Sequence, residues 1–119
     1  MIDINTKAIN LVRGKKGDIF FIHPVFGTGE VYYNILKYFL EYNCTSLELD
    51  PNSFENVTTI NISDLSALYA DYIKRKHKTE RIVIIGYSIG GNIACEITNI
   101  LEEENFIVNK IFLIDSYPE

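Results

Sequence analysis

The most regular signal in the chain is a set of short, uninterrupted apolar runs that are rich in β-branched residues. Ile82–Ile85 is the clearest run, and Ile19–Ile22 and Ile111–Ile114 are similar to it. A continuous apolar run of this length predicts a strand that is buried on both faces of a parallel sheet. Two further strands are predicted at Ala8–Val12 and Thr45–Leu49.

Between these runs, hydrophobic residues recur at helical spacing in three segments. An amphipathic helix is predicted at Ser63–Lys76, a second at Glu30–Glu41 with Thr28 as its cap, and a third around Asn92–Leu101. The polar segment Asp50–Asn61 is predicted to be a connection. The expected inward-facing residues are Val31, Ile35, Leu36, Phe39 and Leu40 in the Glu30–Glu41 helix and Leu65, Leu68, Tyr69, Tyr72 and Ile73 in the Ser63–Lys76 helix.

Strands and helices therefore alternate along most of the chain, and no repeat, low-complexity tract or linker divides it. The alternation predicts a single α/β domain over residues 1–119, with a mainly parallel sheet and helices on both faces. Ligands bind such sheets at the carboxyl ends of the strands. Three segments meet at that edge, namely the loop after Ile22, the serine after Ile85, and Asp115 after Ile114.

The sequence Gly86-Tyr87-Ser88-Ile89-Gly90 is a G-x-S-x-G pattern that joins a predicted strand directly to a predicted helix. A serine in such a corner has a strained backbone, and the residues two positions before and after it come close together. Gly86 and Gly90 tolerate this approach because they have no Cβ. We expect Ser88 to be a nucleophile, with the Ile89 N–H at the helix N-terminus stabilising an oxyanion. An ordinary glycine-rich turn is the alternative interpretation.

An activated serine needs a base and a carboxylate that orients the base. Asp115 fits the acid because it ends the next strand along the chain, at the same edge of the sheet. An aspartate that caps the turn Asp115–Pro118 explains this residue equally well.

The loop His23–Gly29 follows an early strand, which is where a second oxyanion donor is expected. The Val25 N–H is the candidate donor, and Gly27 and Gly29 allow the backbone to approach a substrate closely. An ordinary glycine-containing crossover loop is the alternative interpretation.

The chain has two histidines, and neither is well placed to be the base. His77 ends a helix that precedes the serine strand, so we expect it at the amino edge of the sheet, opposite the serine. His23 lies at the correct edge but inside the oxyanion loop. We expect it to brace that loop rather than to bridge Ser88 and Asp115.

Composition bears on several functional classes. A net charge of −5 argues against a nucleic-acid partner, and the basic cluster Lys74–Lys78 is explained as the end of a helix.

Cys44 and Cys95 form no motif and are expected to be small core residues in a reducing compartment; no metal site is expected. The sequence shows no signal-peptide pattern and no apolar run of membrane-spanning length. We therefore expect a cytoplasmic protein without a membrane partner.

Three motifs, in this order and at these separations, resemble the thioesterase domains of non-ribosomal peptide and polyketide synthetases. The motifs are His23–Gly29 with Tyr32, then Gly86–Gly91, and then Leu113–Tyr117. The resemblance covers nearly the whole chain from about Leu11 onward, and three motifs together are far more specific than the serine pattern alone.

The resemblance implies a partial α/β-hydrolase fold and a definite chemistry. In that family the serine takes an acyl or peptidyl chain from the phosphopantetheine arm of a carrier protein and releases it as an acid or a macrocycle. Carried across, Ser88 is the nucleophile, Asp115 is the triad acid, and Val25 and Ile89 supply the oxyanion N–H groups. The implied partner is an acyl or peptidyl carrier protein, and no cofactor is bound by the domain itself.

Family members continue beyond this point with a lid, further strands and the loop that carries the catalytic histidine, so we expect this chain to be the amino-terminal portion of such a domain. We expect it to be a poor hydrolase on its own and to self-associate through the uncovered strand Ile111–Ile114. A general carboxylesterase or lipase of the same fold, and a non-catalytic remnant that acts as an interaction module, are the alternative functions.

Overall fold

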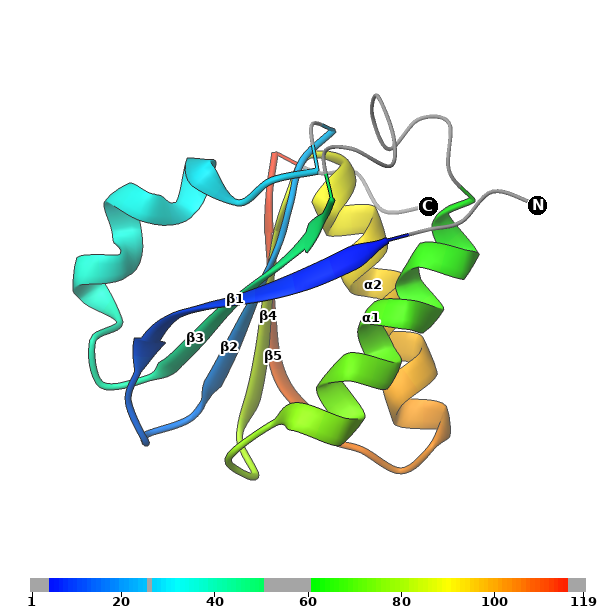
Figure 1. Ribbon diagram of the computed structural model, residues 1–119. Helices are drawn as coiled ribbons and strands as arrows, with labels where there is room; N and C mark the ends of the chain where they lie inside the picture. The colour runs from blue at the N-terminus through cyan, green and yellow to red at the C-terminus, as the bar shows by residue number, and fades with distance from the viewer. Residues whose placement is uncertain (1–4, 26, 51–60, 116–119) are drawn as a thin grey trace.

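The computed structural model describes residues 5–25, 27–50 and 61–115 of the chain. A five-stranded sheet in the order β1-β3-β2-β4-β5 lies at its centre (Figure 1). β2 to β5 run parallel to one another, whereas β1 at one edge is antiparallel to β3. The predicted, mainly parallel sheet is confirmed. Its strands are β1 (Thr6–Arg13), β2 (Asp18–Ile22), β3 (Asn43–Leu49), β4 (Ile82–Tyr87) and β5 (Val108–Ile114).

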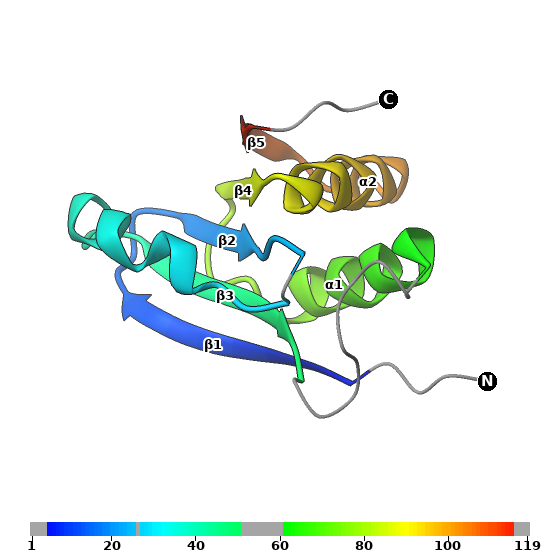
Figure 2. The ribbon, with the colours of Figure 1, turned by 90° about the horizontal axis from the view of Figure 1, so that it is seen from above.

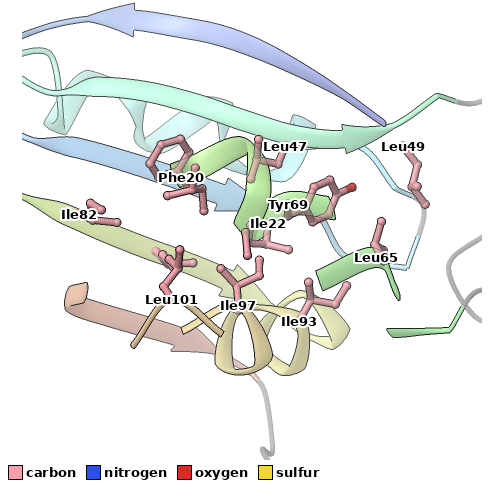
Figure 3. Packing of buried hydrophobic residues seen from close by; sticks show 14 residues of the cluster. Phe20, Ile22, Leu47, Leu49, Leu65, Tyr69, Ile82, Ile93, Ile97 and Leu101 are labelled. Carbon is pink, nitrogen blue, oxygen red and sulfur yellow. The ribbon is translucent and has the colours of Figure 1, made fainter. Parts of the chain in front are cut away.

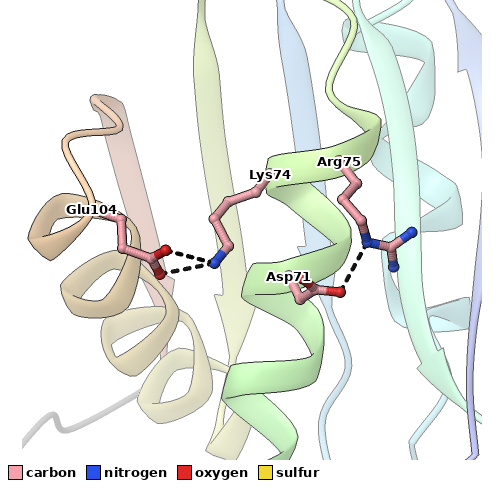
Figure 4. Close-up of polar contacts among 4 residues, drawn as sticks. All are labelled: Asp71, Lys74, Arg75 and Glu104. Atoms are coloured by element: carbon pink, nitrogen blue, oxygen red, sulfur yellow. Dashed lines mark hydrogen bonds and ion pairs between the residues drawn. The ribbon is translucent and has the colours of Figure 1, made fainter.

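Helices cover both faces of the sheet, as the view along the sheet in Figure 2 shows. α1 (Ile62–Lys76) and α2 (Ile89–Glu103) pack on one face, and the 3-10 helix η1 (Glu30–Tyr38) packs on the other. Lys74 in the last turn of α1 forms an ion pair of 2.8 Å with Glu104, which follows α2 (Figure 4). The basic end of α1 and the acidic end of α2 therefore lie side by side.

The larger part of the core lies between the sheet and the layer of α1 and α2 (Figure 3). Every residue of β2 is buried, and so is every residue of β4 up to Gly86. Both central strands are covered on both faces, which is why their sequences are continuous apolar runs rather than alternating ones. The labelled residues of this cluster include Phe20, Ile22, Tyr69, Ile93 and Ile97.

The segment predicted as a helix over Glu30–Glu41 is a 3-10 helix that ends at Tyr38. Its N-cap is Gly29, and no side chain caps it, so the prediction of Thr28 as the cap was wrong. A 3-10 helix has three residues per turn, which places Tyr32 and Ile35 on one ridge toward the sheet. Of the residues that an α-helical period places inside, Val31 and Leu40 are instead 44% and 64% exposed.

Three other apolar residues are more exposed than their pattern predicts. Leu68 of α1 is 41% exposed, and in β5 the side chains of Phe112 and Ile114 are 47% and 42% exposed. β5 is the last strand of the described sheet, and its Val108, Ile111 and Leu113 side chains pack on the α1–α2 side. The run Ile111–Ile114 is therefore buried on one face rather than on two.

Both cysteines are free thiols. Cys44 in β3 is fully buried, its thiol donates to the Phe39 carbonyl oxygen at 3.7 Å, and burial raises its pKa to about 11. Cys95 on α2 is half-buried, and partial burial raises its pKa as well. Cys44 is thus the small core residue that the sequence predicts, whereas Cys95 is only partly covered.

Most of the predicted polar connection Asp50–Asn61 lies outside the described residues. Asn61 is described, and its side chain caps α1 by accepting hydrogen bonds from the Ser63 and Asp64 N–H groups. Within residues 5–25, 27–50 and 61–115, the structure has no helix whose length and apolar character would suffice to cross a bilayer.

Candidate active site

A sharp corner joins β4 to α2 at Ser88. This serine has φ 56° and ψ −126°, a backbone conformation that residues with a side chain rarely adopt. α2 begins at Ile89, so no loop separates the strand from the helix. The first N–H groups of a helix have no acceptor within the helix, and they point toward the serine end of α2. The structure therefore contains the strained strand–serine–helix corner that the G-x-S-x-G pattern predicts.

Close backbone packing at this corner requires Gly86 and Gly90. A Cβ at Gly86 would lie 2.3 Å from the Gly90 carbonyl oxygen, and a Cβ at Gly90 would lie 2.5 Å from the carbonyl oxygens of Ile22 and His23. Both distances are too short for any alanine without backbone movement. Gly90 thus allows the first turn of α2 to rest against the end of β2, where the candidate oxyanion loop begins.

β5 lies beside β4, and a backbone hydrogen bond joins the ends of these two strands at the corner. The Ser88 N–H donates to the Ile114 carbonyl oxygen at 2.9 Å, and Asp115 is the next residue. Asp115 is exposed and has φ 50°, so it also occupies the left-handed region. The structure thus brings Ser88 and Asp115 to adjacent strand ends. Residues 116–118 of the predicted turn lie outside the described residues.

The loop after β2 is anchored to the end of β3 through Gly27. The Gly27 N–H donates to the Pro24 carbonyl oxygen at 3.0 Å, and the Leu49 N–H donates to the Gly27 carbonyl oxygen at 2.9 Å. Gly27 has φ 78°, a value that favours glycine. Val25, the candidate oxyanion donor, is half-buried in this turn and packs against the core on the α1–α2 side. Phe26 lies outside the described residues.

A buried carboxylate that sequence patterns do not reveal holds the far end of the same loop. Glu48 is 3% exposed and accepts hydrogen bonds from the Gly29 N–H at 2.9 Å and from the Ser46 hydroxyl at 2.7 Å. A Cβ at Gly29 would lie 2.1 Å from Ser46 Oγ, so any larger residue would displace the Ser46 hydroxyl from its present position. The available signal is that Ser46 and Glu48 are two residues apart in a strand and share one face.

His23 is fully buried, and both of its ring nitrogens are engaged. Nδ1 lies 2.9 Å from the Pro24 carbonyl oxygen, and Nε2 lies 2.7 Å from the Tyr69 hydroxyl. A carbonyl oxygen only accepts, so Nδ1 carries the proton and Nε2 accepts from the tyrosine. Burial lowers the pKa of His23 below its ordinary value of 6.5, which keeps the imidazole neutral. The side chain is therefore placed to brace the loop and has no ring nitrogen left for a serine.

His77 lies at the opposite edge of the sheet. It caps the C-terminus of α1, its Nδ1 donates to the Thr79 carbonyl oxygen at 2.7 Å, and its ring packs edge-on against Phe106. The length of β4 separates it from Ser88. The two histidines of the chain thus occupy the positions that the sequence indicates.

Tyr32 ties the ends of the two central strands together. Its hydroxyl donates to the Ile22 carbonyl oxygen at the end of β2 and accepts the Tyr87 N–H at the end of β4, at 2.8 Å. Burial raises the pKa of Tyr32 above its ordinary value, so the hydroxyl keeps its proton. The same side chain therefore supports both the strand that leads into the loop and the strand that leads into Ser88.

A strained serine corner in a parallel sheet is the feature that defines the α/β-hydrolase class. Within this class the chain belongs to the thioesterase domain family, whose profile, described as "Thioesterase domain", matches residues 18–119.

The curated relatives are large synthetases. Surfactin synthase subunit 3 of Bacillus subtilis (strain 168) is 30% identical over 101 residues, which cover 85% of this chain and 7% of that protein. Atromentin synthetase greA of Suillus grevillei is 33% identical over 109 residues, which cover 90% of this chain and 11% of that protein. The chain therefore corresponds to a small part of the length of each synthetase.

Solved structures show the same fold. The surfactin thioesterase domain SrfTE superimposes with a TM-score of 0.66 at 26% identity, over 95% of this chain and 44% of that one. The Vlm2 thioesterase domain gives a TM-score of 0.75 at 17% identity, over 93% of this chain and 48% of that one. A lipase-esterase related protein from Clostridium acetobutylicum ATCC 824 gives 0.71 at 21% identity, over 93% of this chain and 46% of that one. The chain thus spans less than half of each of these structures.

Proposed function

We propose that this chain supplies the nucleophile of a thioesterase that releases or edits acyl or peptidyl chains held on the phosphopantetheine arm of a carrier protein. The observation that carries the proposal is the Ser88 corner, with φ 56° between β4 and α2 and a backbone hydrogen bond to the residue before Asp115. The relatives support the substrate class, because they include a surfactin synthase subunit and a protein named nonribosomal peptide synthetase pngA.

In this proposal, Ser88 Oγ attacks the thioester carbonyl and the thiol of the arm leaves, so that an acyl-serine ester forms. The Val25 and Ile89 N–H groups stabilise the oxyanion of the intermediate. Water or a nucleophile within the acyl chain then attacks the ester and frees the serine. Asp115 orients the histidine base, a role that His23 and His77 do not fill because both are engaged elsewhere.

Labelling with a fluorophosphonate tests the nucleophile, since this reagent modifies an activated serine covalently. We expect slow labelling of the 119-residue chain at Ser88, loss of that label in Ser88→Ala, and no loss in Ser63→Ala, which changes an exposed serine on α1. Peptide mass spectrometry locates the adduct. Equal labelling of Ser63 and Ser88, or no adduct at Ser88, contradicts the proposal and favours a non-catalytic interaction module.

Because neither histidine of the chain is assigned as the base, we also expect very slow turnover of a thioester substrate. With an acyl-pantetheine thioester, we expect no burst of thiol release and a turnover close to that of Ser88→Ala. A burst that Ser88→Ala abolishes would show that the chain provides its own base.

A general esterase is the second candidate, because the lipase-esterase related protein from Clostridium acetobutylicum shares the fold. Acylation of Ser88 can be followed by mass spectrometry with the same acyl group on a carrier protein and on free pantetheine. Faster acylation from the carrier favours the thioesterase, and equal rates favour the esterase.

We also propose that β5 mediates self-association, because it is the last strand of the described sheet and exposes Phe112 and Ile114. Light scattering of the chain should give the mass of a dimer or a larger oligomer, and Phe112→Lys should shift it toward the monomer. A monomer at high concentration in the unchanged chain contradicts this part of the proposal.

A further inference from the structure

A groove of about 680 Å³ lies at the amino edge of the parallel strands, at the opposite end of the sheet from Ser88. One wall is formed by the end of β1 and the turn that follows it, and the other by the C-terminal part of α1 and the residues after it. Figure 1 shows the turn after β1 and the C-terminal end of α1 toward the same, lower end of the sheet. The volume of the groove is typical of sites that bind small molecules.

Cations line both walls of this groove. Arg13 and Lys15 lie on the β1 wall, and Lys76 and Lys78 lie on the α1 wall. No aspartate or glutamate lines the groove among the described residues, although the whole chain has a net charge of −5. Positive charge gathered in one recess of an acidic protein attracts anions and repels itself while the recess is empty.

Within the described part of the chain, none of these four cations forms an ion pair with a carboxylate. Arg75, on the same helix, is paired with Asp71 at 2.9 Å (Figure 4), whereas Lys76 and Lys78 have no ion pair there. The buried Asp18 carboxylate at this edge is already occupied, because it accepts hydrogen bonds from the Asn43 amide, the Lys78 and Thr79 N–H groups and the Thr79 hydroxyl.

The floor of the groove is polar and preformed. The Asn10 amide nitrogen donates to the Asn43 side chain at 3.0 Å and to the Cys44 carbonyl oxygen at 3.1 Å. Asn10 Oδ1 accepts from Arg13 Nε at 3.2 Å, which orients the guanidinium at the groove. The register shift between Asn10 and Val12 bends β1 at this point. An arginine whose Nε is fixed still presents two terminal nitrogens to a ligand.

We propose that this groove binds a small phosphorylated molecule, with Arg13 and Lys15 on one side and Lys76 and Lys78 on the other side of a pair of phosphate groups. Arginine matches the geometry of phosphate oxygens, and lysine adds flexible point charges. An acidic protein segment is the competing occupant, but the cations surround a recess with a hydrogen-bonded floor rather than a flat surface. The site is separate from Ser88, and the proposal does not depend on the proposed thioesterase function.

The test is a titration of the 119-residue chain with inorganic pyrophosphate at low salt, followed by amide chemical shifts. We expect shifts at residues 13–15 and 76–79, and weaker binding as sodium chloride is added. Lys76→Gln combined with Lys78→Gln should weaken binding about tenfold. The control combines Lys37→Gln with Lys110→Gln, exposed residues of η1 and β5, which remove the same charge elsewhere and should change the affinity less than about twofold.

Each other outcome overturns the proposal. Shifts that are absent from residues 13–15 and 76–79 show that the groove takes no phosphate. Equal weakening in the two double variants shows only general attraction by net charge. Binding of a hexaglutamate peptide in the absence of pyrophosphate binding assigns the surface to an acidic partner instead. All four lysines are exposed, so the variants are expected to fold, and circular dichroism checks this.

Discussion

On the β2–β3 side of the serine edge, buried polar side chains hold the loop in place, and Glu48 and His23 are the main examples. On the β4–β5 side, the corner itself is shaped by the backbone, through the positive φ of Ser88 and through two glycines at which a Cβ would meet backbone atoms. The Tyr32 hydroxyl supports the strand that leads into this corner. The loop therefore depends on hydrogen bonds that can be removed one at a time. The corner depends on the close approach of backbone atoms at its two glycines, so one added methyl group is enough to disturb it.

The largest effect is expected for Gly90→Ala. The added Cβ would lie 2.5 Å from two carbonyl oxygens at the end of β2, so the corner must open or the chain must fail to fold. We expect a loss of at least about 4 kcal/mol in the free energy of unfolding, measured with urea. The matched control is Gly17→Ala, whose Cβ would meet only side-chain atoms, at 3.3 Å, and should cost under about 1 kcal/mol. Similar losses in the two variants would remove the distinction between the corner and an ordinary turn.

Glu48→Ala should have the next largest effect, because it leaves the Gly29 N–H and the Ser46 hydroxyl without their acceptor. We expect a loss of about 2–3 kcal/mol and faster hydrogen exchange at the Gly29 amide. Glu48→Gln keeps one oxygen acceptor and should lose about half as much. If the alanine and glutamine variants are equally unstable, the acceptor is not what anchors the loop.

Tyr32→Phe tests the connection between the two regions. Removing the hydroxyl takes away the hydrogen bonds that Tyr32 makes with the Ile22 carbonyl oxygen and the Tyr87 N–H, which should cost about 1–2 kcal/mol. Exchange of the Tyr87 amide should accelerate while that of Gly29 stays unchanged. Tyr33→Phe is the control, because Tyr33 is 47% exposed and its substitution should leave stability unchanged. Faster exchange at both amides would mean that the two regions open together.

The smallest effect is the pH dependence that His23 contributes. Its pKa in the folded chain is below 6.5, so below pH 6.5 the unfolded chain binds a proton that the folded chain does not. The free energy of unfolding should therefore fall as the pH is lowered below 6.5, until the folded pKa is reached. Unfolding measurements on His23→Gln should show a shallower dependence of stability on pH than those on the unchanged chain. An unchanged slope in His23→Gln would contradict a neutral, buried imidazole.

The local features of the serine edge could be predicted from the sequence, whereas the long-range contacts could not. The Ser88 corner is a local event, so two glycines at fixed offsets are enough to indicate it, and Asp115 follows from the rule that parallel strands end at one edge. Tyr32 and Glu48 act over longer distances. A tyrosine at helical spacing is typical of any core helix, and its direction here depends on η1 being a 3-10 helix. Glu48 between two leucines is typical of a solvent-facing position, yet its face of the sheet is covered.

The cationic groove could not be predicted from the sequence either, because its residues come from distant parts of the chain. Arg13 and Lys15 belong to one turn, and Lys76 and Lys78 belong to the end of a distant helix. Each pair alone is typical of a solvated surface. Only the antiparallel placement of β1 beside β3 brings the two pairs to one recess.

The buried thiol of Cys44 gives the chain an internal reporter of its own opening. Thiol reagents attack the thiolate, and Cys44 is both fully covered and, with a pKa of about 11, protonated at neutral pH. It can be alkylated only when β3 separates from its neighbours, whereas the half-buried Cys95 can react from smaller openings of α2. The ratio of the two alkylation rates therefore measures how often the centre of the sheet comes apart, with no label added to the natural sequence.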